Sequence, residues 1–376
     1  MAAISDESVV ALLPELAEAA RASNLTVDRF VPPRTGIVEE AAARRHQFIH
    51  GRRGVGKSTL LRRVQKQVEA AGSPAAFIDL ETLRGMEYPD VLIELLVQLL
   101  LSLEMELKGA AKSRGWRKRT ALFRTRGRLR GLRSDLAGLL QEPQEARHSV
   151  RKLQSKARRW AAGGDISLSA AFRNVRSSVG AEMGRGGSQS EDRTVEAEFS
   201  RTKMDGLYTS ATTIRSVLTA AMESLGNASA YVTLDDFHHI ALDDQPKVVA
   251  YLHQVIKNLP IWLKVGGVRH RLNPYVEGDP PMGLQIGHDA SDLSLDVTLE
   301  RFEAAQEFLE RVLRGITEAL SVDIDSMLTD GGRTRLVLGS GGVARDYLNL
   351  TSMALRTANE RPSKPSRPHN RITAGT

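Results

Sequence analysis

The feature that most constrains this chain is a short glycine-rich loop that follows an apolar run. The loop covers residues 51–58 and reads GRRGVGKS, and it comes directly after Phe48-Ile49-His50. The spacing Gly-x-x-x-x-Gly-Lys-Ser is typical of a loop that wraps phosphate groups. The alternative is an ordinary glycine-rich turn with an incidental lysine. An apolar strand before the loop and a helical run after it favour the phosphate loop.

Each residue type in the loop has a chemical role to fill. The glycines let backbone N–H groups turn towards phosphate oxygens, and the helix behind them adds the positive end of its dipole. Lys57 offers a mobile positive charge for β- and γ-phosphates, and the Ser58 hydroxyl is suited to bind Mg²⁺. Thr59 is placed to contact the α-phosphate. The predicted nucleotide-binding residues are Gly51, Gly54, Gly56, Lys57, Ser58 and Thr59.

A second motif lies at the end of a later apolar run, where residues 231–234 are followed by Asp235 and Asp236. Parallel sheets place their ligands at the C-terminal ends of the strands. We therefore expect the Asp235 carboxylate to hold, through water, the Mg²⁺ ion that the Ser58 hydroxyl binds. Asp236 is the candidate that orients or deprotonates an attacking water. Taken alone, the aspartate pair could equally cap the next helix.

The apolar periodicity predicts strands that alternate with helices. Strands are expected over 45–51, 74–81, 229–236, 261–271 and 293–298, and helices over 5–23, 58–71, 88–107, 195–225, 246–258, 303–320 and 334–360. This alternation predicts an α/β fold with a parallel sheet, followed by a small helical domain.

The segment from about 108 to 200 interrupts this pattern. It contains a basic arm, a polar helix near 143–161, an alternating strand over 165–172 and a low-complexity stretch. We interpret it as an insertion in the core fold. The predicted organisation is an N-terminal helical segment 1–30, a core 31–299 that carries the phosphate loop, a C-terminal helical domain 300–360 and a disordered tail 361–376.

Composition and sequence pattern limit the cellular compartment and the kinds of metal site to be expected. The chain has no cysteine, which excludes disulfides and thiolate metal sites. The N-terminus does not have the pattern of a secretory signal, and the apolar window 91–107 is interrupted by charged residues. We expect a cytoplasmic protein without a membrane span. Adjacent His238 and His239 point about 100° apart on a helix and make a poor chelate, so we do not predict a structural metal there.

Three features together resemble P-loop ATPases of the AAA+ and STAND kind. They are the loop at 51–58, the aspartates 235–236 and the strand that lies between them in sequence. More specifically, the chain is similar to the origin-recognition/Cdc6-like ATPases of bacterial genomes, over about residues 30–360 without the insertion. The resemblance implies a parallel-sheet P-loop NTPase core of the ASCE type with a C-terminal helical lid. It also implies ATP and Mg²⁺ as cofactors, ATP hydrolysis and self-association into a homo-oligomer.

The resemblance also suggests two sensors of the nucleotide. In the family, the strand between the loop strand and the aspartate strand ends in a polar residue that senses the γ-phosphate. Arg269 occupies that place here, with Arg271 as second choice, and an arginine is closer to the STAND pattern than to the Asn or Thr of AAA+ proteins. Arg345, at the start of a lid helix, matches the second sensor. The alternatives are a solvated loop cation for Arg269, and an ion pair beside a simple turn at Gly341-Gly342 for Arg345. Only a short polar tail follows the lid, so sequence-specific DNA recognition by a winged helix is not carried over.

The basic arm over 112–133 holds ten lysines and arginines and no acid, against a net charge of +7 for the whole chain. Four leucines share one helical face of the arm, at 122, 129, 132 and 136. The arm is therefore suited to neutralise phosphates of DNA or RNA without reading sequence. A solvated arm and an anionic membrane surface are the alternatives.

Three functions remain compatible with these patterns. The first is an ATPase that acts as a nucleotide-driven switch on nucleic acid, in replication, transposition or defence. The second is a STAND-type signalling ATPase whose output is a protein partner, without DNA binding. The third is a nucleotide-binding scaffold that does not hydrolyse.

Overall fold

The protein is described here by a computed structural model, which divides the chain into two compact units: Met1–Leu136 with Thr212–Thr376, and Ala137–Ala211. The structure describes residues 7–21, 27–113, 116–141, 145–149, 198–226, 228–360 and 372.

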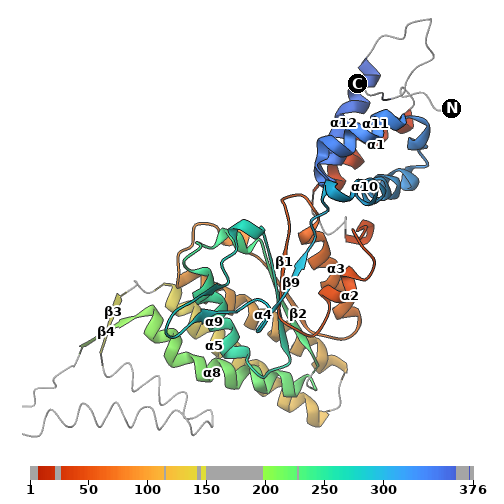
Figure 1. Ribbon diagram of the computed structural model, residues 1–376. Helices are drawn as coiled ribbons and strands as arrows, with labels where there is room; N and C mark the ends of the chain where they lie inside the picture. Colours follow the sequence, from red (N-terminus) through yellow and green to blue (C-terminus); the bar gives the residue numbers. More distant parts are fainter. Residues whose placement is uncertain are drawn as a thin grey trace, which may run out of the picture. The chain divides into compact units, whose positions relative to one another are not determined.

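The centre of the larger unit is a five-stranded, fully parallel sheet (Figure 1). Its strands are, in chain order, β1 (Gln47–His50), β2 (Ala75–Asp79), β5 (Ala230–Asp235), β6 (Ile261–Gly267) and β9 (Ser291–Ser294). Their spatial order is β2-β5-β6-β1-β9, so β6 separates the loop strand β1 from the aspartate strand β5. This is the arrangement that the resemblance implies, and the predicted α/β fold is confirmed.

Helices cover both faces of this sheet (Figure 1). They are α2 (Ile37–Ala41) and α3 (Lys57–Ala70) on one side, and α4 (Asp90–Ser113), α5 (Trp116–Leu140), α8 (Lys203–Ser224) and α9 (Gln245–Ile256) on the other. Apolar side chains of α3 enter the core: Leu60, Leu61 and Val64 are buried against Ile49 of β1 and Tyr231 of β5. This packing fixes the start of α3 at the C-terminal edge of the sheet, where the glycine-rich loop lies.

A helical bundle follows the sheet, as predicted for the C-terminal part. It consists of α10 (Phe302–Thr317), α11 (Asp330–Ser340) and α12 (Ala344–Glu360), with α1 (Glu7–Ala19) added from the start of the chain. Leu12 and Leu16 of α1 are fully buried in one apolar cluster with Phe308, Leu309 and Tyr347. The N-terminal helix, which the sequence sets apart as its own segment, is thus packed into the bundle.

One residue of the tail that the sequence predicts to be disordered is ordered against this bundle. The backbone N–H of Ile372 donates to the carbonyl of Met327 (2.8 Å), and the Ile372 side chain is buried. The rest of the predicted tail lies outside the described residues.

Several predicted boundaries need correction. The strand expected over 261–271 ends at Gly267 and continues as a 3-10 turn, Arg269–Arg271. The last strand covers 291–294 rather than 293–298, because its partner β1 ends at His50, which pairs with Ser294. The helix expected from 195 begins only at Lys203, since Glu198–Thr202 forms the strand β4.

The smaller unit is described only in part. Its strands β3 (Glu145–Ser149) and β4 pair antiparallel, with Glu145 opposite Thr202. The polar helix predicted near 143–161 is wrong at residues 145–149, and the rest of that prediction, like the strand over 165–172 and the low-complexity stretch, lies outside the described residues. The domain boundaries stay predictions.

Candidate functional site

The glycine-rich loop connects the end of β1 at His50 to the start of α3 at Lys57. Gly54 and Gly56 adopt left-handed backbone conformations, with φ of 90° and 94°. A Cβ on Gly54 would also lie 2.9 Å from the Cβ of Arg345. Side chains are strained at such φ values, so glycine is required at both positions. The tight turn brings backbone N–H groups and the first turn of α3 to one point at the sheet edge.

Lys57 is buried at the base of this loop. Its Nζ donates hydrogen bonds to the carbonyl oxygens of Gly51 and Arg52, both at 2.9 Å. Burial lowers the pKa of Lys57, and the carboxylates of Asp236 and Asp235 partly offset that shift. A desolvated ammonium that bonds only to two neutral carbonyls is stabilised when an anion approaches.

Asp235 ends the buried strand β5, and Ser58 lies in the first turn of α3. The Ser58 side chain hydrogen-bonds the Asp235 carboxylate, and the backbone N–H of Asp236 donates to Asp235 Oδ1 (3.0 Å). Burial raises the pKa of Asp235 to about 6, although both hydrogen bonds act in the opposite direction. The structure thus brings together the two residues predicted as magnesium ligands.

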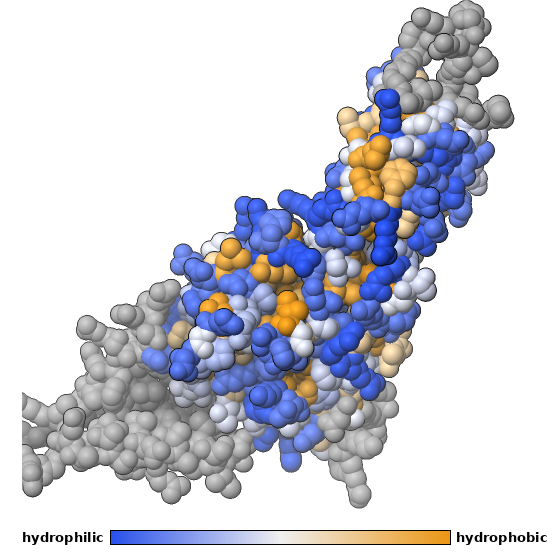
Figure 2. Space-filling model, viewed as in Figure 1, coloured by the Kyte–Doolittle hydropathy of each residue, from blue (hydrophilic) through white to orange (hydrophobic). Residues whose placement is uncertain are grey.

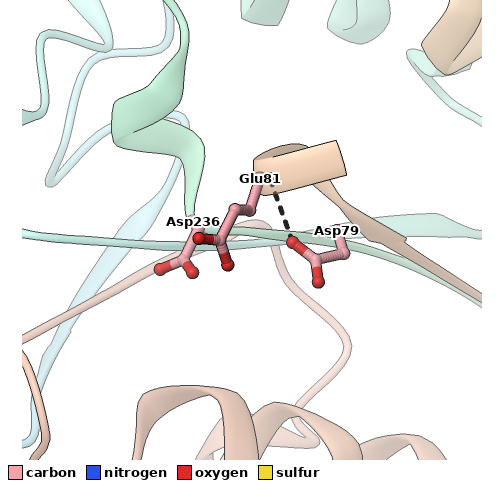
Figure 3. A group of neighbouring side chains, drawn as sticks. All are labelled: Asp79, Glu81 and Asp236. Carbon is pink, nitrogen blue, oxygen red and sulfur yellow. Dashed lines mark hydrogen bonds between the residues drawn. The ribbon is translucent and has the colours of Figure 1, made fainter. Parts of the chain in front are cut away.

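Asp236 follows with a left-handed backbone, at φ 53°. Its carboxylate joins those of Asp79 and Glu81 in a group whose oxygen atoms lie within 4.8 Å of one another (Figure 3). His238 Nδ1 lies 3.7 Å from Asp236 Oδ1, too far for a hydrogen bond. Asp236 is half-buried and faces the carboxylates of Asp79 and Glu81, whereas Asp235 is buried and bonds to Ser58. The two aspartates are therefore placed for different tasks.

The first predicted sensor does not meet the loop. Arg269 and Arg271 are exposed in the turn after β6, two and four residues past the strand end. Within the described part of the chain, neither guanidinium bonds to residues 51–59. The Arg271 carbonyl accepts a hydrogen bond from the buried Gln245 side chain (3.0 Å), which ties the turn to α9. The sensor role of Arg269 stays a prediction.

The second predicted sensor lies directly on the loop. The backbone N–H of Arg345 donates to the Gly54 carbonyl (3.2 Å), and its Nε donates to the carbonyl of Ala20 just past α1 (3.0 Å). Gly341 and Gly342 have positive φ and form the turn between α11 and α12. This turn places Arg345 at the start of α12, against the loop.

Two residues near the loop were missed by the sequence analysis. Asp296, just after β9, accepts a hydrogen bond from the backbone N–H of Arg52 (2.7 Å), and its charge raises the pKa of Lys57. Phe30 lies next to the loop, with a ring atom 3.6 Å from the place of a Cβ on Gly56. Neither residue lies in a motif. The signal that points to Asp296 is its position at the end of a strand that neighbours β1.

The basic arm is a packed helix rather than a free segment over its described side chains. In α5, Leu122, Leu129, Leu132 and Leu136 are buried, as the helical face predicts. The buried carboxylate of Glu104 on α4 pairs with three of its arginines: Arg126 (3.2 Å), Arg130 (2.7 Å) and Arg133 (3.3 Å). Arg124 and Arg128 are exposed on the other side of the helix.

The described metal-capable group holds carboxylates alone, and the rings of His238 and His239 stack tilted at 4.6 Å rather than converge. None of the described helices has the length and apolar character needed to cross a bilayer.

Comparison with known proteins bears on the loop-bearing segment. A family model described as ORC-CDC6-like matches residues 15–77, which contain α2, β1, the loop and α3. No curated protein matches the chain. Among solved structures, the Orc1 protein of Aeropyrum pernix in complex with DNA aligns with 92% of this chain and 64% of its own, at 10% identity and a TM-score of 0.37. The family model confirms, over residues 15–77, the similarity to ORC/Cdc6-like proteins that the sequence motifs indicate.

Proposed function

We propose that the chain binds ATP with Mg²⁺ at residues 51–59, hydrolyses it, and works as a nucleotide-driven switch on nucleic acid. The observation that carries the proposal is the hydrogen bond between Ser58 and the buried Asp235 carboxylate, next to the buried Lys57. These three groups come from two elements that the sheet order brings to one edge. In P-loop NTPases the loop Ser/Thr and a carboxylate share a magnesium ion, and the loop lysine binds the phosphates.

The residues fit a magnesium ion, because the Ser58 hydroxyl and the buried Asp235 carboxylate lie within hydrogen-bond reach of each other and offer the oxygen ligands that Mg²⁺ prefers. Ser58 and Asp235 would hold the ion, which when bound neutralises charge on the β- and γ-phosphates. Lys57 would turn its Nζ from the Gly51 and Arg52 carbonyls to the phosphates. Asp236 is the group placed to orient the attacking water, and Arg345 the cation placed to follow the nucleotide from the lid.

The nucleic-acid part of the proposal depends on α5. Its exposed Arg124 and Arg128, with the half-exposed ring of Phe123 beside them, form a face that suits a phosphate backbone. The Orc1 structure named above is a complex with DNA. The contact would be insensitive to base sequence and would weaken with salt.

The second candidate is a STAND-type signalling ATPase whose output is a protein partner. The pairing of Glu104 with Arg126, Arg130 and Arg133 favours it, because these three charges already have an anionic partner in the fold. Under this alternative α5 is a structural element. Self-association of the chain stays a prediction under both candidates.

The test is ATP turnover at low salt, with and without double-stranded DNA. Three variants are compared with the wild type: Lys57→Ala, the double variant Arg124→Glu/Arg128→Glu, and Arg356→Glu as an exposed charge-reversal control on α12. A double charge reversal is preferable to deletion of 112–133, because deletion would remove the buried leucines of α5. Each buried leucine contributes about 1.5–3 kcal/mol to the fold.

We expect Lys57→Ala to lower nucleotide affinity by about 100-fold or more, since the loop loses the ammonium that would bind the phosphates. We expect DNA to stimulate turnover of the wild type and the Arg356 control, but not of the double variant. ATP turnover that is the same with and without DNA would support the signalling alternative. ATP binding without any turnover in the wild type would support the scaffold.

A further inference from the structure

Arg52, the second residue of the loop, makes contacts that phosphate binding does not explain. Its backbone N–H donates to Asp296 Oδ1 (2.7 Å), and its Nη2 donates to the Val297 carbonyl (2.7 Å). Asp296 and Val297 belong to the linker between β9 and α10, which joins the sheet to the helical bundle. The Arg52 guanidinium is therefore directed away from the interior of the loop and towards this linker.

The same guanidinium also meets the turn between α11 and α12. A Cβ on Gly341 would lie 3.5 Å from Arg52 Nη1, and a Cβ on Gly342 would lie 3.6 Å from Nη2 and 2.5 Å from the Val297 carbonyl oxygen. Three segments meet here: the loop, the linker and the turn that carries Arg345. Glycine at 342 allows the turn to approach the linker backbone this closely.

Arg52 is at the same time a direct neighbour of the loop lysine. Its carbonyl oxygen accepts one of the two hydrogen bonds of Lys57 Nζ, and Asp296 lies close enough to raise the pKa of that lysine. A phosphate in the loop would draw Nζ away from the Arg52 carbonyl and would place negative charge near Asp296. Both events act on the residue that holds the linker.

From these contacts we infer that Arg52 is a positioning residue, which with Asp296 and Val297 forms a latch that transmits the occupancy of the loop to the helical bundle. The inference rests on the proposed nucleotide binding and adds a route that is separate from Arg345. The latch is closed while Lys57 bonds to the Arg52 carbonyl. It is weakened when a phosphate takes over the lysine and repels Asp296.

The loop supplies a matched control in Arg53, which is also exposed but makes neither contact with residues 296–297. Arg52→Ala and Arg53→Ala remove the same charge from the same loop, so both should lower ATP affinity equally, by about threefold or less. Asp296→Ala opens the latch from the other side. Because it removes a negative charge near Lys57, it should raise ATP affinity by a similar factor.

The position of the bundle is monitored through the distance between two spin labels, one on Gln67→Cys in α3 and one on Met353→Cys in α12. Both positions are exposed, and the chain has no other cysteine. We expect ATP with Mg²⁺ to shift the label distance in the wild type and in Arg53→Ala. In Arg52→Ala and Asp296→Ala the shift should fall to roughly half or less. Arg52→Lys should not restore it, because one ammonium cannot reproduce both guanidinium contacts, that of Nη2 with the Val297 carbonyl (2.7 Å) and that of Nε with Asp296 Oδ1 (3.5 Å).

Three results would overturn the latch: an equal shift in Arg52→Ala and Arg53→Ala, no shift in a wild type that binds ATP, or full rescue by lysine. If the wild type does not bind ATP, the proposed function fails, and the latch is judged in the nucleotide-free protein. There, Arg52→Ala and Asp296→Ala should broaden the distance distribution while Arg53→Ala should not, and an unchanged distribution in all three would refute it.

Discussion

Two groups of buried charged side chains in the larger unit differ in how their charges are balanced. At the sheet edge, burial lowers the pKa of Lys57 and raises that of Asp235 to about 6, so each group is pushed towards its neutral form. Between α4 and α5, burial alone would raise the pKa of Glu104, but the hydrogen bond from Arg130 and the charges of Arg130, Arg133 and Arg126 lower it overall.

We interpret this difference as the one between the proposed nucleotide site and a structural contact. Glu104 has its partners within the fold, and a further ligand has little to add there. Lys57 and Asp235 are held at a cost that a bound phosphate and a cation would relieve. Figure 2 shows that hydrophilic and apolar side chains are interspersed over the visible face of the molecule, so the surface view does not single out either group. The pKa shifts separate them.

The largest expected effect concerns Asp235→Asn. We expect turnover to fall by about 100-fold or more because a magnesium ligand is lost. At pH 7 the free energy of unfolding of the same variant should be higher by on the order of 1 kcal/mol, because the substitution removes a desolvated charge. Steady-state kinetics and urea denaturation measure the two effects. A less stable and inactive variant would mean that Asp235 is a structural residue.

The reverse behaviour is expected of Glu104→Gln. It should reduce the free energy of unfolding by about 1–3 kcal/mol, because three arginines lose their carboxylate, and leave ATP affinity unchanged. Glu106→Gln on the same helix is the control. Burial and the nearby Glu69 raise the pKa of Glu106, so its neutralisation should be neutral or slightly stabilising. Equal losses for both variants would contradict the assigned role of Glu104.

Acidification should affect the two groups in different pH windows. Asp235 has a folded pKa of about 6, so magnesium-dependent ATP affinity should fall up to tenfold per pH unit below that value. Glu104 has a pKa below its usual 4.5, so its stabilising effect is present above pH 4.5 and is lost only as the pH falls through the lowered value. Titration of ATP binding from pH 7 to 5 tests this. Asp235→Asn should show a flatter profile, and an equal slope in both proteins would assign the decline to ATP itself.

The last prediction concerns a pair of glycine substitutions, of which Gly127→Ala has the smallest expected effect. Gly54→Ala should lower the free energy of unfolding by about 1–3 kcal/mol, because φ is 90° and the new Cβ would contact Arg345. Gly127→Ala, in the middle of α5 with open space around the position of a Cβ, should stabilise by about 0.5–1 kcal/mol. Thermal denaturation measures both. Stabilisation by both substitutions would mean that the loop tolerates a side chain in this conformation.

Much of the fold could be predicted because its signals are local. The glycine spacing, the apolar runs and the leucine face of α5 each lie within about 20 residues. Strand ends were less accurate, because they depend on the partner strand: β9 stops where β1 stops. The position of α1 could not be read from its own sequence, since the apolar cluster that buries Leu12 and Leu16 comes from residues almost 300 positions later.

The site, like the fold, could be predicted where its residues lie in local motifs. Lys57, Ser58 and Asp235 lie in motifs, and the sheet order brings them together. Asp296 and the contact of Arg345 with Ala20 join segments that are distant in sequence, and no spacing rule points to them. The pairing of Glu104 with α5 likewise depends on how two helices pack, so the sequence presents these arginines as free cations.

The placement of α1 has a mechanical consequence. Because α1 belongs to the bundle and α2 to the sheet, the chain passes between these two bodies twice, once between residues 19 and 37 and once between residues 294 and 302. A body attached at one point can swivel in every direction, whereas a body attached at two points turns mainly about the line that joins them. The bundle is therefore connected to the sheet by two segments of backbone, and the first of them contains Phe30, which lies beside the loop.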